Sequence, residues 1–137
     1  RVVSLMVVVP GLDILLEAGI ENLREKSIRQ SEYFLFLVKE ILGEFGFRSG
    51  SHADYKKRGS HVSLKHPEGY RICQALIHPQ KNDLRIIPDF REPDNIRFGI
   101  TPLYTTFSEI RHTVARLKKI ITTKEFENFS TNRKSVT

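Results

Sequence analysis

The stretch DNIRFGITPLY, Asp94 to Tyr104, contains the strand candidate IRFGI, a largely apolar run of strand length that turn-forming residues precede. The loop before it, DFREPDN, carries the Pro, Asp and Asn residues that suit tight turns. A second strand candidate, LRIIP, precedes that loop. This part of the chain therefore predicts two strands that a short polar loop connects.

A helix is predicted directly after this stretch. Thr106 and Glu109 have the spacing of a capping box, in which two side chains satisfy free N–H groups at a helix start. Residues 123–137 show no sustained period, and we expect them to form a peripheral tail. The apolar residues expected on one face of the helix are Ile110, Val114, Leu117 and Ile121.

The most regular helical pattern runs from Glu21 to Leu42. Its apolar residues fall mostly three or four positions apart, which is typical of a helix with one buried face. Glu25 and Arg29 are placed to form an ion pair one turn apart. The apolar positions are Leu23, Ile28, Phe34, Leu35, Val38, Ile41 and Leu42.

Residues 2–18 form an apolar segment that is also expected to be helical. Pro10 should break it, because proline lacks an N–H donor and clashes with the preceding turn. Gly19 should end it. Its apolar opening, VVSLMVVV, which ends at Pro10-Gly11, is much shorter than the roughly 20 apolar residues that a membrane span needs. The chain does not begin with methionine, so we expect it to be a fragment that starts within a longer protein.

The middle of the chain mixes strands with one helix. FGFRSG and SHVSLKH are strand candidates, and EGYRICQALI, which follows Pro67, is a helix candidate. The expected fold is α+β in a single domain of residues 1–137, with a small, mostly antiparallel sheet that helices cover. Within it we expect a helical segment at 1–44, an αβ sandwich at 45–122 and the tail at 123–137.

Composition excludes several function classes. The chain has 137 residues with 39% hydrophobic and 28% charged residues, which is ordinary for a folded domain. Its net charge of +6 comes from scattered basic residues rather than a long run, so no nucleic-acid partner is expected. Cys73 is the only cysteine, which excludes an internal disulfide and suits a reducing, cytoplasmic location.

Motifs for catalysis or metal binding are absent from the sequence. It has no glycine-rich phosphate loop, HExxH, CxxC or GxSxG motif, and its five histidines show no ligand spacing, so no metal is assigned. Asp89, Glu92 and Asp94 crowd one loop beside Arg91 and Arg97. From residue types alone, a local cluster of ion pairs is favoured over acids that orient a ligand-binding arginine.

Three blocks nevertheless resemble the kynureninase family, in the same order and with similar spacing. They are GLDILLEAGIENLREKS, RGSHVSLKHPEGYRICQALI and IPDFREPDNIRFGITPLY. The resemblance covers nearly the whole chain and implies the small C-terminal domain of an aminotransferase-like enzyme that depends on pyridoxal 5'-phosphate (PLP). It implies a linking and docking role for residues 1–44, and a homodimer of subunits that each carry a large domain as well.

The resemblance also implies a reaction and a site residue. Kynureninases hydrolyse L-kynurenine or 3-hydroxykynurenine to anthranilate or 3-hydroxyanthranilate and L-alanine. Arg97 matches the arginine that binds the α-carboxylate of the substrate, and its planar guanidinium suits that contact. Lys39, Lys56 and Lys57 lie outside the family's Schiff-base lysine motif, so this chain alone is expected to be inactive, with neither catalytic nor cofactor-binding residues.

The chain departs from the family at Val7-Val8-Val9-Pro10, where small or acidic residues are common, and its docking side is therefore left open. Tyr104 is expected to pack rather than to act in catalysis. Two alternative functions remain. One is the same small-domain role in a desulfurase-like or aminotransferase-like PLP enzyme. The other is a stand-alone basic module that binds RNA or a protein.

Overall fold

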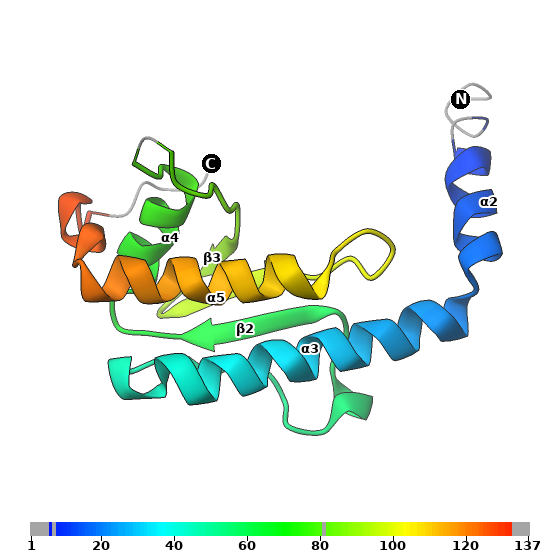
Figure 1. Cartoon of the computed structure of the whole chain (residues 1–137), viewed down its shortest axis with the longest axis horizontal. Helices are drawn as coiled ribbons and strands as arrows, with labels where there is room; N and C mark the ends of the chain where they lie inside the picture. Colours follow the sequence, from blue (N-terminus) through cyan, green and yellow to red (C-terminus); the bar gives the residue numbers. More distant parts are fainter. Residues whose placement is uncertain (1–5, 7, 81, 133–137) are drawn as a thin grey trace.

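The structure, a computed structural model, describes Met6 and residues 8–80 and 82–132. Helices and strands follow one another in an α+β arrangement, as expected, with a four-stranded sheet that helices cover on one face (Figure 1). The elements are α2 (Val8–Ala18), α3 (Ile20–Leu42), η1 (Gly43–Phe45), β1 (Arg48–Ser49), η2 (Tyr55–Lys57), β2 (His61–Lys65), α4 (Gly69–Ile77), β3 (Asp89–Arg91), β4 (Asn95–Gly99), α5 (Phe107–Thr122) and η3 (Glu125–Asn128).

The sheet has the strand order β1-β2-β4-β3, and every neighbouring pair is antiparallel. Alternate residues of its two central strands point to opposite faces. Val62 and Leu64 of β2 lie opposite Phe98 and Ile96 of β4, and all four are buried under the helices. The residues between them, including Arg97, therefore lie on the other face of the sheet, which none of the described helices covers.

The core lies between the sheet and the pair α3 and α5, which run side by side in the same direction (Figure 1). Phe34 of α3 meets Phe98 of β4 edge to face, with ring centroids 5.2 Å apart. Each large apolar side chain that is fully buried here stabilises the fold by about 1.5–3 kcal/mol. The predicted capping box at the start of α5 is confirmed, since Glu109 N–H donates to Thr106 Oγ1 and Thr106 N–H donates to Glu109 Oε2.

The prediction of a strand at LRIIP was wrong. Residues 84–88 are not part of the sheet, and the strand β3 begins one residue later, inside the predicted loop. The Ile86 N–H donates to the carbonyl oxygen of Leu76 at the end of α4, so this segment bonds a helix rather than a strand. Pro88 has no N–H to donate, which also suits a position before the strand.

The predicted break at Pro10 was also wrong. Pro10 lies within helix, since Met6 before it and the whole stretch Val8–Ala18 around it are helical. The change of direction comes at Gly19, whose φ of 76° lies in the left-handed region that glycine adopts without strain. Val7, part of the unusual valine run, lies outside the described residues.

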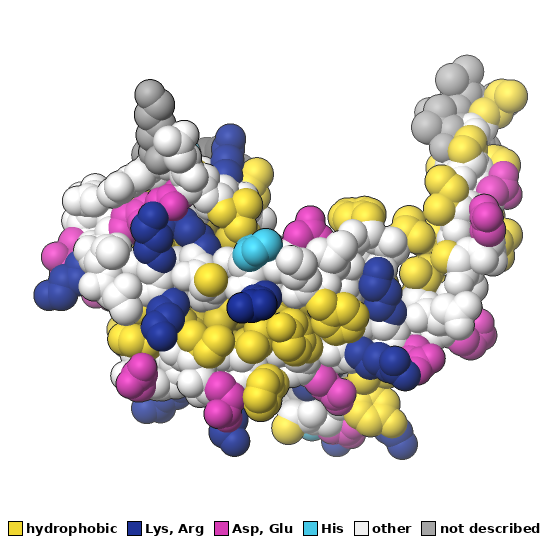
Figure 2. Space-filling view, in the orientation of Figure 1, with side chains coloured by type: hydrophobic (Ala, Val, Ile, Leu, Met, Phe, Trp, Pro, Cys, Tyr) yellow, Lys and Arg dark blue, Asp and Glu magenta, His cyan; other side chains and the backbone are white. Residues whose placement is uncertain are grey.

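Helix α2 stands apart from the rest of the molecule (Figure 1). None of its residues is buried, although most of them are apolar. Figure 2 shows their side chains along its visible surface. Leu16 is 69% exposed and Val8 is 60% exposed. No described helix is both long enough and apolar enough to cross a membrane.

The end of the chain is more closely packed than its sequence pattern indicated. Within the segment that was expected to be peripheral, Glu125 and Phe126 of η3 are buried. Phe126 packs on the core, and Arg71 of α4 lies over its ring at 5.2 Å. On α5, Ile120 is fully buried and the expected Ile121 only partly.

Candidate functional site

Arg97 lies in the middle of β4, on the uncovered face of the sheet. The strand register places it between Ser63 of β2 and Asp89 of β3. Its neighbours Ile96 and Phe98 are buried on the helix side, so the alternation of the strand directs Arg97 the other way. The Arg97 side chain is 38% exposed, which leaves it accessible to a ligand.

Asp89 is the ion-pair partner of Arg97. The Arg97 Nε donates to Asp89 Oδ2 at 3.0 Å, and the Arg97 Nη2 donates to the same oxygen. Arg91 Nε also donates to this oxygen, at 2.9 Å. Partial burial of Asp89 acts to raise its pKa, but the bonds from the two arginines outweigh it, and the pKa lies below its ordinary value. Asp89 thus forms ion pairs with both arginines, as either interpretation of this loop requires.

The uncovered face is basic around this pair. Arg48 and Lys65 lie directly opposite each other on β1 and β2. Asn95 lies opposite Lys65 and Ser63 lies opposite Arg97, and Ser63 Oγ donates to Asn95 Oδ1 at 3.2 Å. Positive charge therefore predominates over this face, and it would attract an anionic ligand.

The turn that follows Arg97 is tied to helix α3. Thr105 N–H donates to the Thr101 carbonyl at 2.8 Å, which closes the turn. Gln30 of α3 is fully buried and its Nε2 donates to the Thr105 carbonyl at 2.6 Å. This bond anchors the end of β4 against the helix layer. Tyr104 at the tip of the turn is 72% exposed, so the expectation that it packs was wrong.

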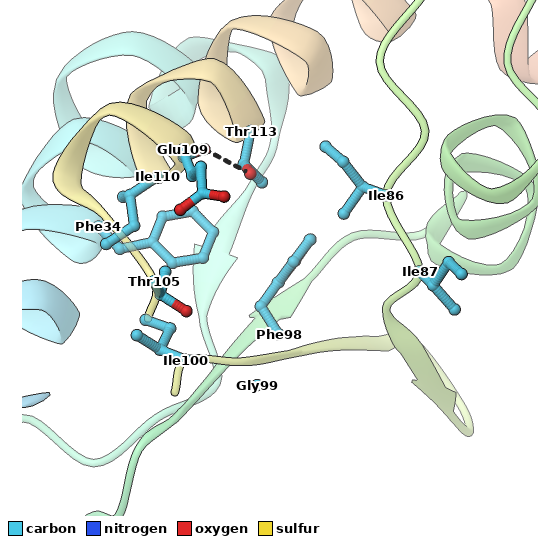
Figure 3. Close-up of a pocket in the computed structure, with 10 residues that line it drawn as sticks. All are labelled: Phe34, Ile86, Ile87, Phe98, Gly99, Ile100, Thr105, Glu109, Ile110 and Thr113. Atoms are coloured by element: carbon cyan, nitrogen blue, oxygen red, sulfur yellow. Dashed lines mark hydrogen bonds between the residues drawn. The ribbon is translucent and has the colours of Figure 1, made fainter. Parts of the chain in front are cut away.

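A cavity of about 110 Å³ lies on the helix side of β4 (Figure 3). Arg97 is not among the residues that line it. Phe34, Phe98 and Ile110 line it together with Ile86 and Thr113. In Figure 3 Phe34 comes from α3, Phe98 from β4, Ile110 and Thr113 from α5, and Ile86 from the segment before β3. Ligand pockets are typically about 300–1,000 Å³, so this cavity is better explained as a packing gap of the core.

The histidines, the lysines and Cys73 are the other side chains of the described residues that could bind a metal or react. His61 and His66 lie at the two ends of β2, and no group of three described His, Cys, Asp or Glu residues could hold a metal ion. None of the described lysines is buried. Burial, with a smaller contribution from Asp89, raises the pKa of the Cys73 thiol to about 11, so Cys73 is a poor nucleophile.

Two residues of this site could not be identified from the sequence pattern. Asp89 was grouped with Glu92 and Asp94, and only the register of β3 with β4 places it beside Arg97. Gln30 is a polar residue on the buried face of a helix, and its partner lies 75 residues away in the sequence. A buried glutamine in an apolar stripe indicates that a polar partner exists but does not identify it.

Comparison with known proteins identifies relatives along most of the chain. Residues 23–117 match a family described as the kynureninase C-terminal domain. The chain is 39% identical over 136 residues to kynureninase of Geobacillus thermodenitrificans and 40% identical over 136 residues to that of Bacillus anthracis. These matches cover 99% of this chain and 31% of each relative. Kynureninase of Pseudomonas fluorescens is 41% identical over 123 residues, which are 90% of this chain and 28% of the relative.

Proposed function

Because the chain belongs to the kynureninase family, whose C-terminal domain it matches, we propose that it is the substrate-carboxylate-binding domain of a PLP-dependent enzyme. The enzyme hydrolyses L-kynurenine and 3-hydroxykynurenine to L-alanine and anthranilate or 3-hydroxyanthranilate. The chain spans about a third of the length of these relatives, so the larger part of such an enzyme lies outside it.

The position of Arg97 is the observation that carries this proposal. Arg97 is a partly exposed arginine at the centre of a basic face, on a strand that the core and the turn after it hold in place. A guanidinium is always charged and can donate two parallel hydrogen bonds to one carboxylate. Arg97 would bind the α-carboxylate of kynurenine in this way and so fix the orientation of the bonds at the α-carbon.

The cofactor belongs to the other part of the proposed enzyme. When bound, PLP withdraws electrons from the substrate and so weakens the bonds at the α-carbon. The described residues do not fit PLP, because none of their lysines is buried in a pocket where it could hold the cofactor. The large domain would therefore supply the cofactor and the lysine, and this chain alone would show no PLP absorbance after dialysis.

The apolar helix α2 supports the linking and docking role of residues 1–44. Soluble proteins rarely leave large contiguous apolar surfaces exposed, and such a surface usually contacts another part of the protein or a partner. None of the α2 residues is buried within the described part of the chain. We propose that this surface packs against the large domain of a cytoplasmic, homodimeric enzyme.

The test is the activity of the full-length enzyme with and without the Arg97 guanidinium. We expect Arg97→Ala and Arg97→Lys to lower kcat/KM for kynurenine at a cost of about 2–4 kcal/mol, because the paired hydrogen bonds are lost or degraded. Arg111→Ala, which removes an exposed arginine from α5, is the matched control and should have little effect. An unchanged kcat/KM in both Arg97 variants would refute the role of Arg97.

Assays of the same full-length enzyme on kynurenine and on cysteine distinguish the proposed activity from the desulfurase-like alternative. The wild-type enzyme should release anthranilate from kynurenine and should not release sulfide from cysteine. Activity on cysteine alone would overturn the proposed substrate and would leave a carboxylate-binding role for Arg97 in a different reaction.

A further inference from the structure

The two donors through which Arg97 binds Asp89 are on one edge of its guanidinium. Nε–H and one N–H of Nη2 point to the same side of the planar group, and both donate to Asp89 Oδ2. The other N–H of Nη2 and one N–H of Nη1 form a second edge, at the end of the side chain. The two hydrogen bonds from Arg97 to Asp89 use Nε and Nη2 and leave Nη1 outside the ion pair.

The second edge suits a carboxylate. Its two N–H groups are parallel and spaced to meet the two oxygens of one carboxylate, which is the strongest arrangement of such a pair. Asp89 uses the first edge, so it does not compete for the N–H groups that a substrate would bind. The orientation of the second edge depends on what holds the first.

We propose that Asp89 is a positioning residue that holds the Nε–Nη2 edge of Arg97 and thereby presents the Nη1–Nη2 edge to the α-carboxylate of the substrate. This inference rests on the proposed function. It adds a residue that touches neither the substrate nor the cofactor and acts through Arg97.

The backbone makes Asp89 suitable for this role. Asp89 is directly opposite Arg97 in the β3–β4 register, so the hairpin sets the distance between them. An arginine side chain is long and loses much conformational freedom when it is fixed, and Arg97 is 38% exposed. If Asp89 fixes the guanidinium before the substrate binds, substrate binding does not have to cost this conformational entropy.

Arg91 offsets the negative charge that Asp89 places beside the substrate carboxylate. A carboxylate beside Arg97 repels the substrate carboxylate and reduces the net charge that the substrate meets. Arg91 donates to the same oxygen of Asp89, so two guanidinium groups face one carboxylate. The cluster therefore keeps a net positive charge for the substrate.

The sign of the change in KM distinguishes positioning from repulsion. If Asp89 positions Arg97, Asp89→Ala in the full-length enzyme should raise KM for kynurenine about tenfold, the effect of one lost ordering interaction. Asp89→Asn keeps one acceptor oxygen and should raise KM less. If Asp89 only repels the substrate, both variants should lower KM, and this result would overturn the proposal.

A comparison in two backgrounds tests whether Asp89 acts through Arg97. In an Arg97→Ala background, Asp89→Ala should leave KM within about twofold, because there is no guanidinium left to position. Inhibition by kynuramine, which is kynurenine without its α-carboxylate, should be the same in wild type and Asp89→Ala. An equal rise in KM in both backgrounds, or weaker kynuramine binding in Asp89→Ala, would show a general structural role and overturn the proposal.

A control variant and the pattern of results distinguish the positioning role of Asp89 from the proposed function of the domain. Glu127→Ala removes another exposed carboxylate in an ion pair, with Lys124, outside the proposed docking segment, and should leave KM unchanged. If Asp89→Ala does not fold, the comparison is made with Asp89→Asn. Loss of function in Arg97→Ala without any effect of the Asp89 variants would overturn only the positioning role. An unaffected Arg97→Ala enzyme would instead overturn the proposed function.

Discussion

At the scale of single residues, the least water-exposed charges of the described chain form the pair Arg116 and Glu125. Their side chains are 3% and 4% exposed, and both Nη atoms of Arg116 donate to Glu125 at 2.6 Å. Arg116 Nη2 also donates to the Ala75 carbonyl at 3.3 Å, and Asp83 lies 3.5 Å from Nη1. These contacts tie η3 to α5 and α4. They hold the pKa of Arg116 above its usual range, chiefly through the hydrogen bond to Glu125.

We expect Glu125→Ala to lower the free energy of unfolding by about 3 kcal/mol, because it leaves the Arg116 charge buried with only the longer contact to Asp83, at 3.5 Å, among its ion pairs with described residues. Urea unfolding of the chain measures this. Glu127→Ala is the control, since its contact with Lys124 is 3.9 Å and exposed, and it should cost less than about 1 kcal/mol. The double change Arg116→Met with Glu125→Leu should recover most of the loss. Equal losses of unfolding free energy in Glu125→Ala and Glu127→Ala would contradict this explanation.

Sequence patterns predict side-chain contacts within one helix but not the ion pairs of Arg116 and Arg97. The capping box of Thr106 and Glu109 was predicted because its partners are three residues apart on one helix. The pair Arg116 and Glu125 requires the chain to reverse near Lys124, where φ is 54°, and no local pattern shows that reversal. Asp89 and Arg97 meet only through the hairpin register, which the expected strand at LRIIP obscured.

At the scale of elements, His66 connects three segments of the chain. It follows β2, its Nε2 donates to the Phe45 carbonyl of η1 at 3.0 Å, and its Nδ1 accepts the Glu68 N–H just before α4 at 3.0 Å. Its ring lies against Phe47 with centroids 4.6 Å apart. A neutral imidazole with its proton on Nε2 satisfies both contacts, and a second proton on Nδ1 would remove the contact to Glu68.

We expect the stability of the chain to depend on the protonation of His66. Burial lowers the pKa of His66 below 6.5, and the bond to Phe45 and the charge of Glu68 only partly oppose this. In the pH range between the lowered pKa and 6.5, the unfolded chain binds the proton and the folded chain does not. The contribution of neutral His66 to the free energy of unfolding is therefore complete above pH 6.5 and declines as the pH falls below it.

The measurement is the free energy of unfolding from about pH 5 to pH 8 for wild type and His66→Gln. Glutamine keeps a donor and an acceptor but does not titrate, so the slope of stability with pH should be shallower in the variant. His61→Gln is a matched control, because His61 is exposed. Arg48, Lys65 and Asp94 line the same recess as His66. The same slope in wild type and His66→Gln would contradict the prediction.

The elements themselves were largely predictable. The helix expected from Glu21 to Leu42 is α3, and the strands expected in SHVSLKH and IRFGI are β2 and β4, because buried faces impose clear periods on these segments. Strand β3 was missed because it has only three residues at the edge of the sheet, too few to show a period. Pro10 was misjudged because the helix continues on both sides of it, and a proline within a helical pattern does not always end the helix.

At the scale of the whole molecule, the described chain consists of a packed body and a helix that the body does not cover. The body is held by the sheet, α3, α4 and α5, whereas α2 contributes no residue to the core. The basic face around Arg97 is uncovered as well. Both surfaces agree with a domain that works against a larger partner, which is the arrangement proposed for the full-length enzyme.

We expect charges on α2 to leave the isolated body intact and to damage the complete enzyme. Leu12 and Leu16 are 50% and 69% exposed and lie one turn apart on the same side of α2. The double change Leu12→Glu with Leu16→Glu should alter the unfolding free energy of the chain by less than about 0.5 kcal/mol, because neither side chain is buried. In the complete enzyme it should lower the thermal midpoint, because two carboxylates would be buried at the domain contact.

Urea unfolding of the chain and thermal unfolding of the complete enzyme measure the two effects. Phe34→Ala, at a core position that is 2% exposed, is the positive control and should cost about 3–5 kcal/mol in the isolated chain. A loss of more than about 2 kcal/mol in the isolated chain with Leu12→Glu and Leu16→Glu would mean that α2 packs against its own body. An unchanged thermal midpoint of the complete enzyme would mean that this side of α2 faces water, and the docking surface would have to lie on its other side.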